Sequence, residues 1–299
     1  MKNFVIITDS SSNMTPEQMC EFGIDAIVPF HLYANGNEYL ANDAWAGMDA
    51  ATFYAEVGKG LDMSSSQATS NEYEAVFRKY LEQGHDILSI SCAEALSSSV
   101  KESYKAKERV EKDYPDAKIY CVDSYNCCYS LTMLAAECSK KRANGETIED
   151  VYEWLLKERL YFNEVGTVES LTYLRNAGRV SASAAFFGGI FSIKPLIVYD
   201  GTGHNVAIEK VRGRKSSLEK TAEYIIKYAY LDKYNTVFIS HADCLEDCKY
   251  VAEIVKAHFL DIQIDFRFGF IEPGIGYSVG PGTIIANFYG DPAIRNLNK

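Results

Sequence analysis

Short apolar runs alternate with amphipathic segments along the first half of the chain, and this alternation restricts the fold more than any other feature. The runs at residues 4–7 and 87–91 have the length of single strands, and segments with helical spacing follow them. Parallel strands need a crossover between them, so this order predicts a parallel sheet covered by helices on both faces. The predicted strands are residues 4–7, 24–30, 87–91 and 118–122, and the predicted helices begin at Thr15 and span residues 71–82, 97–112 and 125–142.

The pattern changes after a further predicted helix that ends near residue 161. A hairpin-type turn signal, Asp200-Gly201, separates apolar runs on either side, and strand–helix alternation then resumes. We therefore predict a two-domain α/β protein, with a doubly wound, mainly parallel N-terminal domain (residues 1–160) and a C-terminal α/β domain (residues 161–299). The predicted C-terminal strands are residues 165–168, 192–198, 206–211, 236–240 and 262–268, and the helices are residues 217–230 and 245–258.

Composition excludes several classes of protein. The formal net charge of −11 argues against nucleic acid as a partner, because phosphate backbones attract cationic surfaces. The apolar runs are shorter than the ~20 residues of a membrane span, so an integral membrane protein is not expected. The N-terminal apolar run is too short for a signal peptide, and an acidic residue follows it too early. The eight scattered cysteines then predict free thiols in a cytoplasmic protein.

Small polar clusters follow several predicted strands. In open α/β sheets, ligands bind beyond the carboxyl ends of the strands, so clusters that share an edge favour a ligand site. The same residue types also cap helices, and capping is the simpler interpretation of any single cluster. The clusters at strand ends are residues 8–12, 91–99 and 123–126, and a fourth hydroxyl-rich segment, residues 64–70, is interpreted as a loop that precedes a helix.

A Gly-Arg pair, Gly178-Arg179, precedes an apolar run that contains paired glycines at residues 188–189. Such a turn can place a cation at the mouth of an apolar cavity, which suits an amphipathic ligand. A basic cluster at Lys210, Arg212, Arg214 and Lys215 is either a solvated face or a phosphate contact, since guanidinium groups bind phosphate bidentately.

Two other motifs are weighed and set aside. Residues 276–280 match Gly-x-Ser-x-Gly, but no histidine follows Ser278, as the order of a hydrolase triad requires. His241, Cys244 and Cys248 have a spacing that could ligate zinc, yet no second cluster lies nearby, and core thiols explain the cysteines. We expect neither a metal nor a cofactor.

The chain resembles the bacterial DegV family over nearly its whole length. Each matching motif is weak alone, but their order and spacing together are specific. The resemblance implies a fatty acid bound in a tunnel between two domains, and in some members its presentation to a fatty-acid kinase that phosphorylates the carboxylate. The motifs are residues 8–11, 65–67, 96–99, 123–124, 174–180, 193–195, 210–215, 241–243 and 280–283.

By this resemblance, Ser65, Glu94, Ser97 and Ser278 would bind the lipid head group. The family's Thr-Ser-Gln is Ser65-Ser66-Gln67 here, its Ser-Ser pair is Ala93-Glu94, and its histidine before Gly-Pro-Gly is Ser278. The resemblance also implies a contact with the kinase or the acyl phosphate, here Arg179 and Arg212. The apolar run at residues 182–191 is most simply core, but its paired glycines leave room that suits a tunnel wall, here Phe186, Phe187 and Ile190.

Among the differences from the family's motifs, Glu94 has the largest physical consequence. An ionised glutamate about 4 Å from an acyl carboxylate would be repelled by several kcal/mol. Three accounts remain open: the side chain points away and complements the next helix, it is protonated, or the head group is not a carboxylate.

The function predicted from the sequence is therefore a fatty-acid carrier that is not itself an enzyme and has a long-chain fatty acid and a fatty-acid kinase as partners. One alternative is a binder of another amphipathic molecule with a neutral or cationic head. A second is a stand-alone enzyme that uses a serine nucleophile or phosphoryl transfer, although no base lies near a candidate serine and no Walker loop is present.

Overall fold

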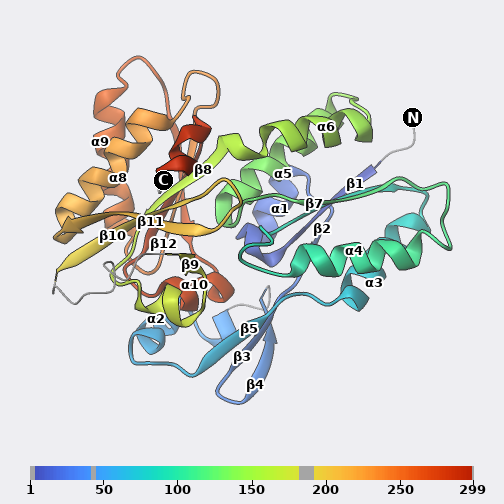
Figure 1. The fold of residues 1–299 in the computed structure, drawn as a ribbon, viewed down its shortest axis with the longest axis horizontal. Coiled ribbons are helices and arrows are strands. Elements are labelled where there is room, and N and C mark those ends of the chain that lie inside the picture. Colours follow the sequence, from blue (N-terminus) through green and yellow to red (C-terminus); the bar gives the residue numbers. More distant parts are fainter. Residues whose placement is uncertain (1–3, 42–44, 182–191, 298–299) are drawn as a thin grey trace.

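The N-terminal part of the chain folds around a parallel sheet with strand order β2-β1-β6-β7 (Figure 1). The computed structural model describes residues 4–41, 45–181 and 192–297. The strand and helix alternation thus builds the predicted parallel sheet. Its strands are β1 (Phe4–Asp9), β2 (Ala26–Val28), β6 (Asp86–Ser91) and β7 (Ile119–Asp123).

Helices cover both faces of this sheet, as the apolar character of the strands requires. Alternate residues of β1 point to opposite sides. Val5 and Ile7 pack with α3 (Ser70–Leu81) and α4 (Ser99–Val110). Phe4 and Ile6 pack on the other face, where the helices are α5 (Cys128–Ala143) and α6 (Ile148–Glu158). The shorter α1 (Pro16–Phe22) begins at the predicted capping box of Thr15 and Gln18.

A small antiparallel sheet with strand order β4-β3-β5 was not predicted. Its strands have only four residues each, and β5 reads Met-Ser-Ser-Ser, a composition that the sequence analysis interpreted as a polar loop. Pairing with β3 rather than intrinsic preference makes this segment extended. The elements of this region are β3 (His31–Ala34), β4 (Asn37–Leu40), the 3-10 turn Trp45–Gly47, α2 (Ala50–Gly58) and β5 (Met63–Ser66).

The described strands after residue 161 form one mixed sheet with order β13-β12-β14-β8-β10-β11-β9. The hairpin predicted at Asp200-Gly201 joins β10 and β11, which pair antiparallel. The sheet consists of β8 (Phe162–Thr167), β9 (Val180–Ser181), β10 (Ile193–Tyr199), β11 (Asn205–Arg212), β12 (Thr236–His241), β13 (Asp265–Phe270) and β14 (Ile284–Tyr289).

The two faces of this sheet have different neighbours. Helices α8 (Arg214–Tyr228) and α9 (Leu245–His258) cover the outer face (Figure 1). The inner face meets α5, where the rings of Tyr129 and Phe238 lie with their centroids 4.7 Å apart. Helix α5 therefore packs against both large sheets. Short helices α7 (Thr172–Asn176) and α10 (Pro273–Val279) lie toward the small sheet and α2.

Arg295, in the C-terminal 3-10 helix Pro292–Asn296, joins the two halves of the molecule. It is buried, and its guanidinium group donates five hydrogen bonds to neutral oxygens. Two acceptors follow β7, and the other three belong to the C-terminal half. The acceptors are the carbonyl oxygens of Tyr125 (3.0 Å), Phe162 (2.6 Å) and Asp200 (3.1 Å) and the side-chain Oδ1 atoms of Asn126 (2.7 Å) and Asn163 (3.0 Å).

Candidate functional site

A cavity of about 780 Å³, including the space at its mouth, lies between the N-terminal elements, the small sheet and the inner face of the C-terminal sheet. The exposure of the lining residues shows which end of the cavity is open. Arg179, at the open end, is exposed, Ser65 and Ser97 are half-buried, and Tyr199, at the deep end, is fully buried. Its apolar lining consists of Phe30, Leu96, Leu174, Ile197, Ile275, Val279 and Ile285.

Three of the four predicted head-group residues meet at this cavity. Ser65 lies on β5, Ser97 lies before α4, and Ser278 lies on α10, yet all three line the same space. The Ser65 hydroxyl is 3.1 Å from the hydroxyl of Tyr277. Hydroxyl groups from three distant parts of the chain are therefore available to one polar head group.

Ser97 also has a helix-start role close to the capping that the sequence analysis kept open. Its Oγ accepts a hydrogen bond from the Ser99 backbone N at 3.3 Å and lies 3.0 Å from the Ser99 hydroxyl. The N-cap position of α4 is Ser98, so Ser97 supports the helix start from one residue before the cap, and it also lines the cavity.

Glu94, the fourth predicted residue, does not line the cavity. Its carboxylate is exposed and lies 3.0 Å from the Lys101 Nζ. Its backbone N donates to Asp123 Oδ1 at 3.2 Å, which turns this part of the loop toward β7. The first of the three accounts holds, because the side chain points away, and the prediction that Glu94 contacts the head group is wrong in this structure.

The two predicted partner contacts occupy different places. Arg179 lines the cavity, and its guanidinium group donates to the carbonyl oxygens of Leu96 and Ala177. Arg212 is exposed at the end of β11, seven residues beyond Asn205, which bonds the Arg179 carbonyl through its side-chain Nδ2. At about 3.3 Å per residue, this spacing is roughly 23 Å. The structure therefore does not bring the two arginines together.

Phe186, Phe187 and Ile190, the predicted tunnel wall, lie outside the described residues. That assignment stays a prediction.

Asp9 fixes the floor of the cavity at the ends of β1 and β6. Its buried carboxylate accepts hydrogen bonds from the backbone N atoms of Ser11 (3.1 Å) and Cys92 (2.9 Å) and from the Tyr73 hydroxyl (3.4 Å). Burial raises the pKa of Asp9, and these hydrogen bonds oppose that rise. Because Ser11 and Cys92 both line the cavity, Asp9 positions two strand ends without contacting the space itself.

Helix α10 is held by Glu272 at its start. The Glu272 carboxylate accepts hydrogen bonds from the backbone N atoms of Gly274 (2.7 Å) and Ile275 (2.6 Å). This cap orients the helix that carries Ile275, Tyr277 and Ser278 into the lining.

A polar group that the sequence analysis missed lies deep in the cavity. Glu164 is on β8, is 2% exposed, and lines the space together with Tyr199, Cys127 and Cys128. Burial raises the pKa of Glu164 to about 8, and the neighbouring Tyr199 hydroxyl and the charge of Arg295 limit that rise. The predicted strand began at residue 165, so Glu164 was interpreted as a flanking residue. A glutamate inside a strand of an interior sheet is the signal that could have identified it.

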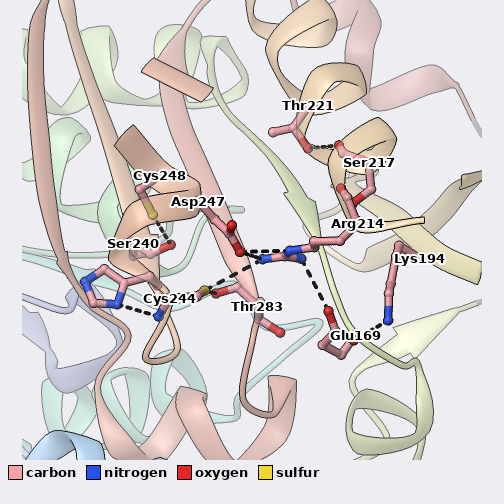
Figure 2. A network of polar contacts seen from close by, with 11 residues as sticks. Glu169, Lys194, Arg214, Ser217, Thr221, Ser240, Cys244, Asp247, Cys248 and Thr283 are labelled. Carbon is pink, nitrogen blue, oxygen red and sulfur yellow. Dashed lines mark hydrogen bonds and ion pairs between the residues drawn. The ribbon is translucent and has the colours of Figure 1, made fainter. Parts of the chain in front are cut away.

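One member of the basic cluster, Arg214, lies in a polar network with Asp247, Glu169 and Lys194 (Figure 2). Arg214 Nε and Nη2 donate to Asp247 Oδ2 at 2.9 and 2.6 Å, and Nη1 lies 3.8 Å from Glu169 Oε1. Lys194 pairs with the other oxygen of Glu169. Arg214 therefore serves the ion-pair network, and the other three members of the cluster, Lys210, Arg212 and Lys215, are exposed.

The same network includes the residues considered for zinc. The Cys244 Sγ donates to the Thr283 carbonyl at 3.4 Å, and the Cys248 Sγ donates to the Ser240 carbonyl at 4.0 Å. His241 Nδ1 accepts from the Cys244 backbone N at 3.3 Å. Among the described residues, no group of three or more potential ligands could hold a metal ion, and the two cysteines are the core thiols of the simpler interpretation.

The Gly-x-Ser-x-Gly motif does not form a nucleophile elbow. Its residues through Val279 lie in α10, whereas an elbow places the serine on a turn between a strand and a helix. No histidine is among the described residues that line the cavity beside Ser278.

Comparisons with known proteins agree on one family. The model of the DegV family of uncharacterised proteins matches residues 3–289. A DegV domain-containing protein of Clostridium perfringens is 32% identical over 297 residues, covering 97% of this chain and 99% of the relative.

Solved structures of the family share the fold. A DegV family protein from Thermus thermophilus that binds fatty acid matches with a TM-score of 0.83 at 19% identity, over 97% of this chain and 100% of that one. A stearic-acid-binding protein from Eubacterium ventriosum matches with a TM-score of 0.82 at 23% identity, over 96% and 98%.

The described helices include none with the length and apolar character to cross a bilayer. The family model covers almost the entire chain, the Clostridium relative matches end to end, and the two-domain fold coincides with that of the solved structures. The protein thus belongs to the DegV family.

Proposed function

We propose that this protein binds a long-chain fatty acid in the cavity, with the carboxylate at the hydroxyl groups and the alkyl chain against the apolar lining. The observation that carries this proposal is the convergence of Ser65, Ser97 and Ser278 on one apolar space with Arg179 at its mouth. The family members from Thermus thermophilus and Eubacterium ventriosum, which bind fatty acid and stearic acid, support it.

The energetics of the site suit this ligand. Each methylene group buried against the lining contributes about 0.8 kcal/mol. A hydroxyl hydrogen bond to a carboxylate contributes about 1.5–3 kcal/mol, because the acceptor is charged. The chain thus supplies affinity, and the hydroxyl groups set the direction in which the acid lies.

The position of Glu94 removes the main support for a neutral or cationic head group. That alternative depended on a glutamate beside the head group, and this carboxylate pairs with Lys101 outside the cavity. The enzyme alternative has less support still, since Ser278 lies within a helix and no lining histidine accompanies it among the described residues. The proposal is therefore a carrier that performs no chemistry on its own.

Native mass spectrometry of the purified protein tests the proposal. We expect a bound mass that organic extraction identifies as a fatty acid. After delipidation, we expect a rise in the unfolding temperature when C16 and C18 acids are added, because ligand binding stabilises only the folded state. Absence of a co-purified lipid together with no thermal shift across the acid panel would contradict the proposal.

We further propose that the protein presents its fatty acid to a fatty-acid kinase in the cytoplasm, where ATP is available. The exposed Arg179 at the mouth of the cavity supports this role, since a guanidinium group can neutralise an acyl phosphate. Arg212 lies apart from the cavity and serves as a second, separate candidate for the kinase contact.

Replacing Arg179 with alanine tests this role. We expect acyl-phosphate formation by an added fatty-acid kinase to fall at least about tenfold, a loss typical of one charge-assisted contact. Binding of the acid, measured by calorimetry, should change less than about threefold. The Arg212→Ala variant reports whether the second arginine contributes. Unchanged phosphorylation of the acid carried by Arg179→Ala would remove Arg179 from the interaction.

A further inference from the structure

Two oxygen atoms in the cavity lack hydrogen-bond partners. Glu164 Oε1 and Asn205 Oδ1 are both buried acceptors without a partner among the described residues, and both residues line the space. Their residues are 2% and 9% exposed, so bulk water does not reach them freely. Buried polar groups are nearly always hydrogen-bonded, and leaving one unpaired costs free energy.

Register places the two residues in one row across the inner face of the C-terminal sheet. Tyr199 on β10 pairs with Asn205 on β11. On its other side, β10 pairs antiparallel with β8, Ile197 opposite Gly166. Continued by two residues, this register sets Tyr199 opposite Glu164. Strands lie about 4.8 Å apart, so the two side chains are separated by roughly 10 Å, with the Tyr199 ring between them.

Neighbouring protein groups do not supply the missing donors. The Tyr199 hydroxyl is engaged with Cys127, donating to its carbonyl at 3.0 Å and accepting from its backbone N at 3.1 Å. The amide Nδ2 of Asn205 donates to the Arg179 carbonyl at 3.2 Å. This bond fixes the orientation of the Asn205 amide and leaves its oxygen unpaired in a residue that lines the cavity.

We propose that the preferred ligand is a hydroxylated fatty acid, whose chain hydroxyl bonds with Glu164 or Asn205. This inference rests on the proposed fatty-acid function and names the class of chain that the cavity selects. A plain alkyl chain would cover both oxygens and leave them unpaired. A hydroxyl on the alkyl chain donates to one of these oxygens, so Glu164 and Asn205 favour a hydroxylated fatty acid over an unsubstituted one.

The protonation state of Glu164 suits this contact. Because burial raises its pKa to about 8, the carboxyl is mostly neutral at pH 7. A neutral carboxyl both accepts from a hydroxyl and donates to it. It also avoids placing a second negative charge in a space that holds a fatty-acid carboxylate.

Calorimetry with the delipidated full-length protein tests the inference. The probes are octadecanoic acid and hydroxyoctadecanoic acids with the hydroxyl at successive positions along the chain. We expect at least one positional isomer to bind about tenfold more tightly than octadecanoic acid. Glu164→Met should abolish that preference and raise the affinity for octadecanoic acid, whereas Glu164→Gln, which keeps hydrogen-bonding atoms, should retain it.

The outcomes separate this inference from the proposed function. If octadecanoic acid binds the unmodified protein as tightly as every hydroxylated isomer, the inference is overturned and fatty-acid binding stands. If no acid binds, both fall. Should Glu164→Met fail to fold, Glu164→Ala replaces it, and a preference for the hydroxylated isomer that survives in both Asn205→Leu and the Glu164 variant would refute the inference.

Discussion

Replacing Arg295 with methionine is expected to lower the free energy of unfolding by about 3–5 kcal/mol. The substitution removes the donor of five hydrogen bonds and leaves buried oxygens of both halves without partners. Asn126 in the first half and Asn163 in the second both depend on this guanidinium group. Urea denaturation followed by circular dichroism measures the loss.

Two further variants give this measurement its controls. Arg295→Lys keeps a positive charge but replaces the planar fork by a single nitrogen, so we expect it to lose most of the same stability. Arg109→Met removes an exposed arginine that contacts Asn71 and Glu74, and should cost less than about 1 kcal/mol. A loss of similar size in Arg295→Met and Arg109→Met would show that Arg295 does not join the halves energetically.

The double substitution Ser65→Ala and Ser97→Ala should weaken fatty-acid binding by about 100-fold or more. Each hydroxyl that bonds the carboxylate contributes about 1.5–3 kcal/mol, and about 1.4 kcal/mol corresponds to a factor of ten. Titration calorimetry on the delipidated proteins with one C18 acid gives the two dissociation constants.

The chain provides matched controls beside each serine. Ser64 and Ser98 are adjacent hydroxyl residues that are exposed and lie outside the cavity lining. The variant Ser64→Ala with Ser98→Ala should bind the acid as the unmodified protein does. Because Ser97 also supports the start of α4, Ser97→Ala should lose about 1 kcal/mol of stability without ligand, and this loss is measured separately. Equal affinities in the two double variants would rule out the hydroxyl contacts.

Much of the fold could be predicted because the order of apolar and polar residues in a strand indicates which of its faces are buried. Residues of β1 are apolar at every position from Phe4 to Ile7, which is the pattern of a strand covered on both faces. The small sheet could not be predicted, because β5 consists of Met63 and three serines and is extended only through its pairing with β3. Local preference says little about strands that tertiary pairing creates.

The sequence predicts which residues lie near the cavity where those residues belong to motifs at the ends of helices and strands. It does not predict whether a given side chain points into the cavity or away from it. Ser65, Ser97 and Ser278 meet as the family motifs implied. Glu94 occupies a motif position, but the loop turns its carboxylate to Lys101, a direction that spacing does not encode. Glu164 contributes from inside β8, and it was missed because the predicted strand began one residue later, at residue 165.

Helix α5 has buried residues along most of its length and packs against both large sheets. The hydrophobic core therefore continues through this helix from one half of the molecule to the other. Separating the two halves would expose the apolar surface of α5 to water and break the hydrogen bonds of Arg295. If a fatty acid binds as proposed, it would enter and leave past Arg179 while the two halves stay joined, and its exchange rate would depend on the side chains at the cavity mouth rather than on a hinge motion.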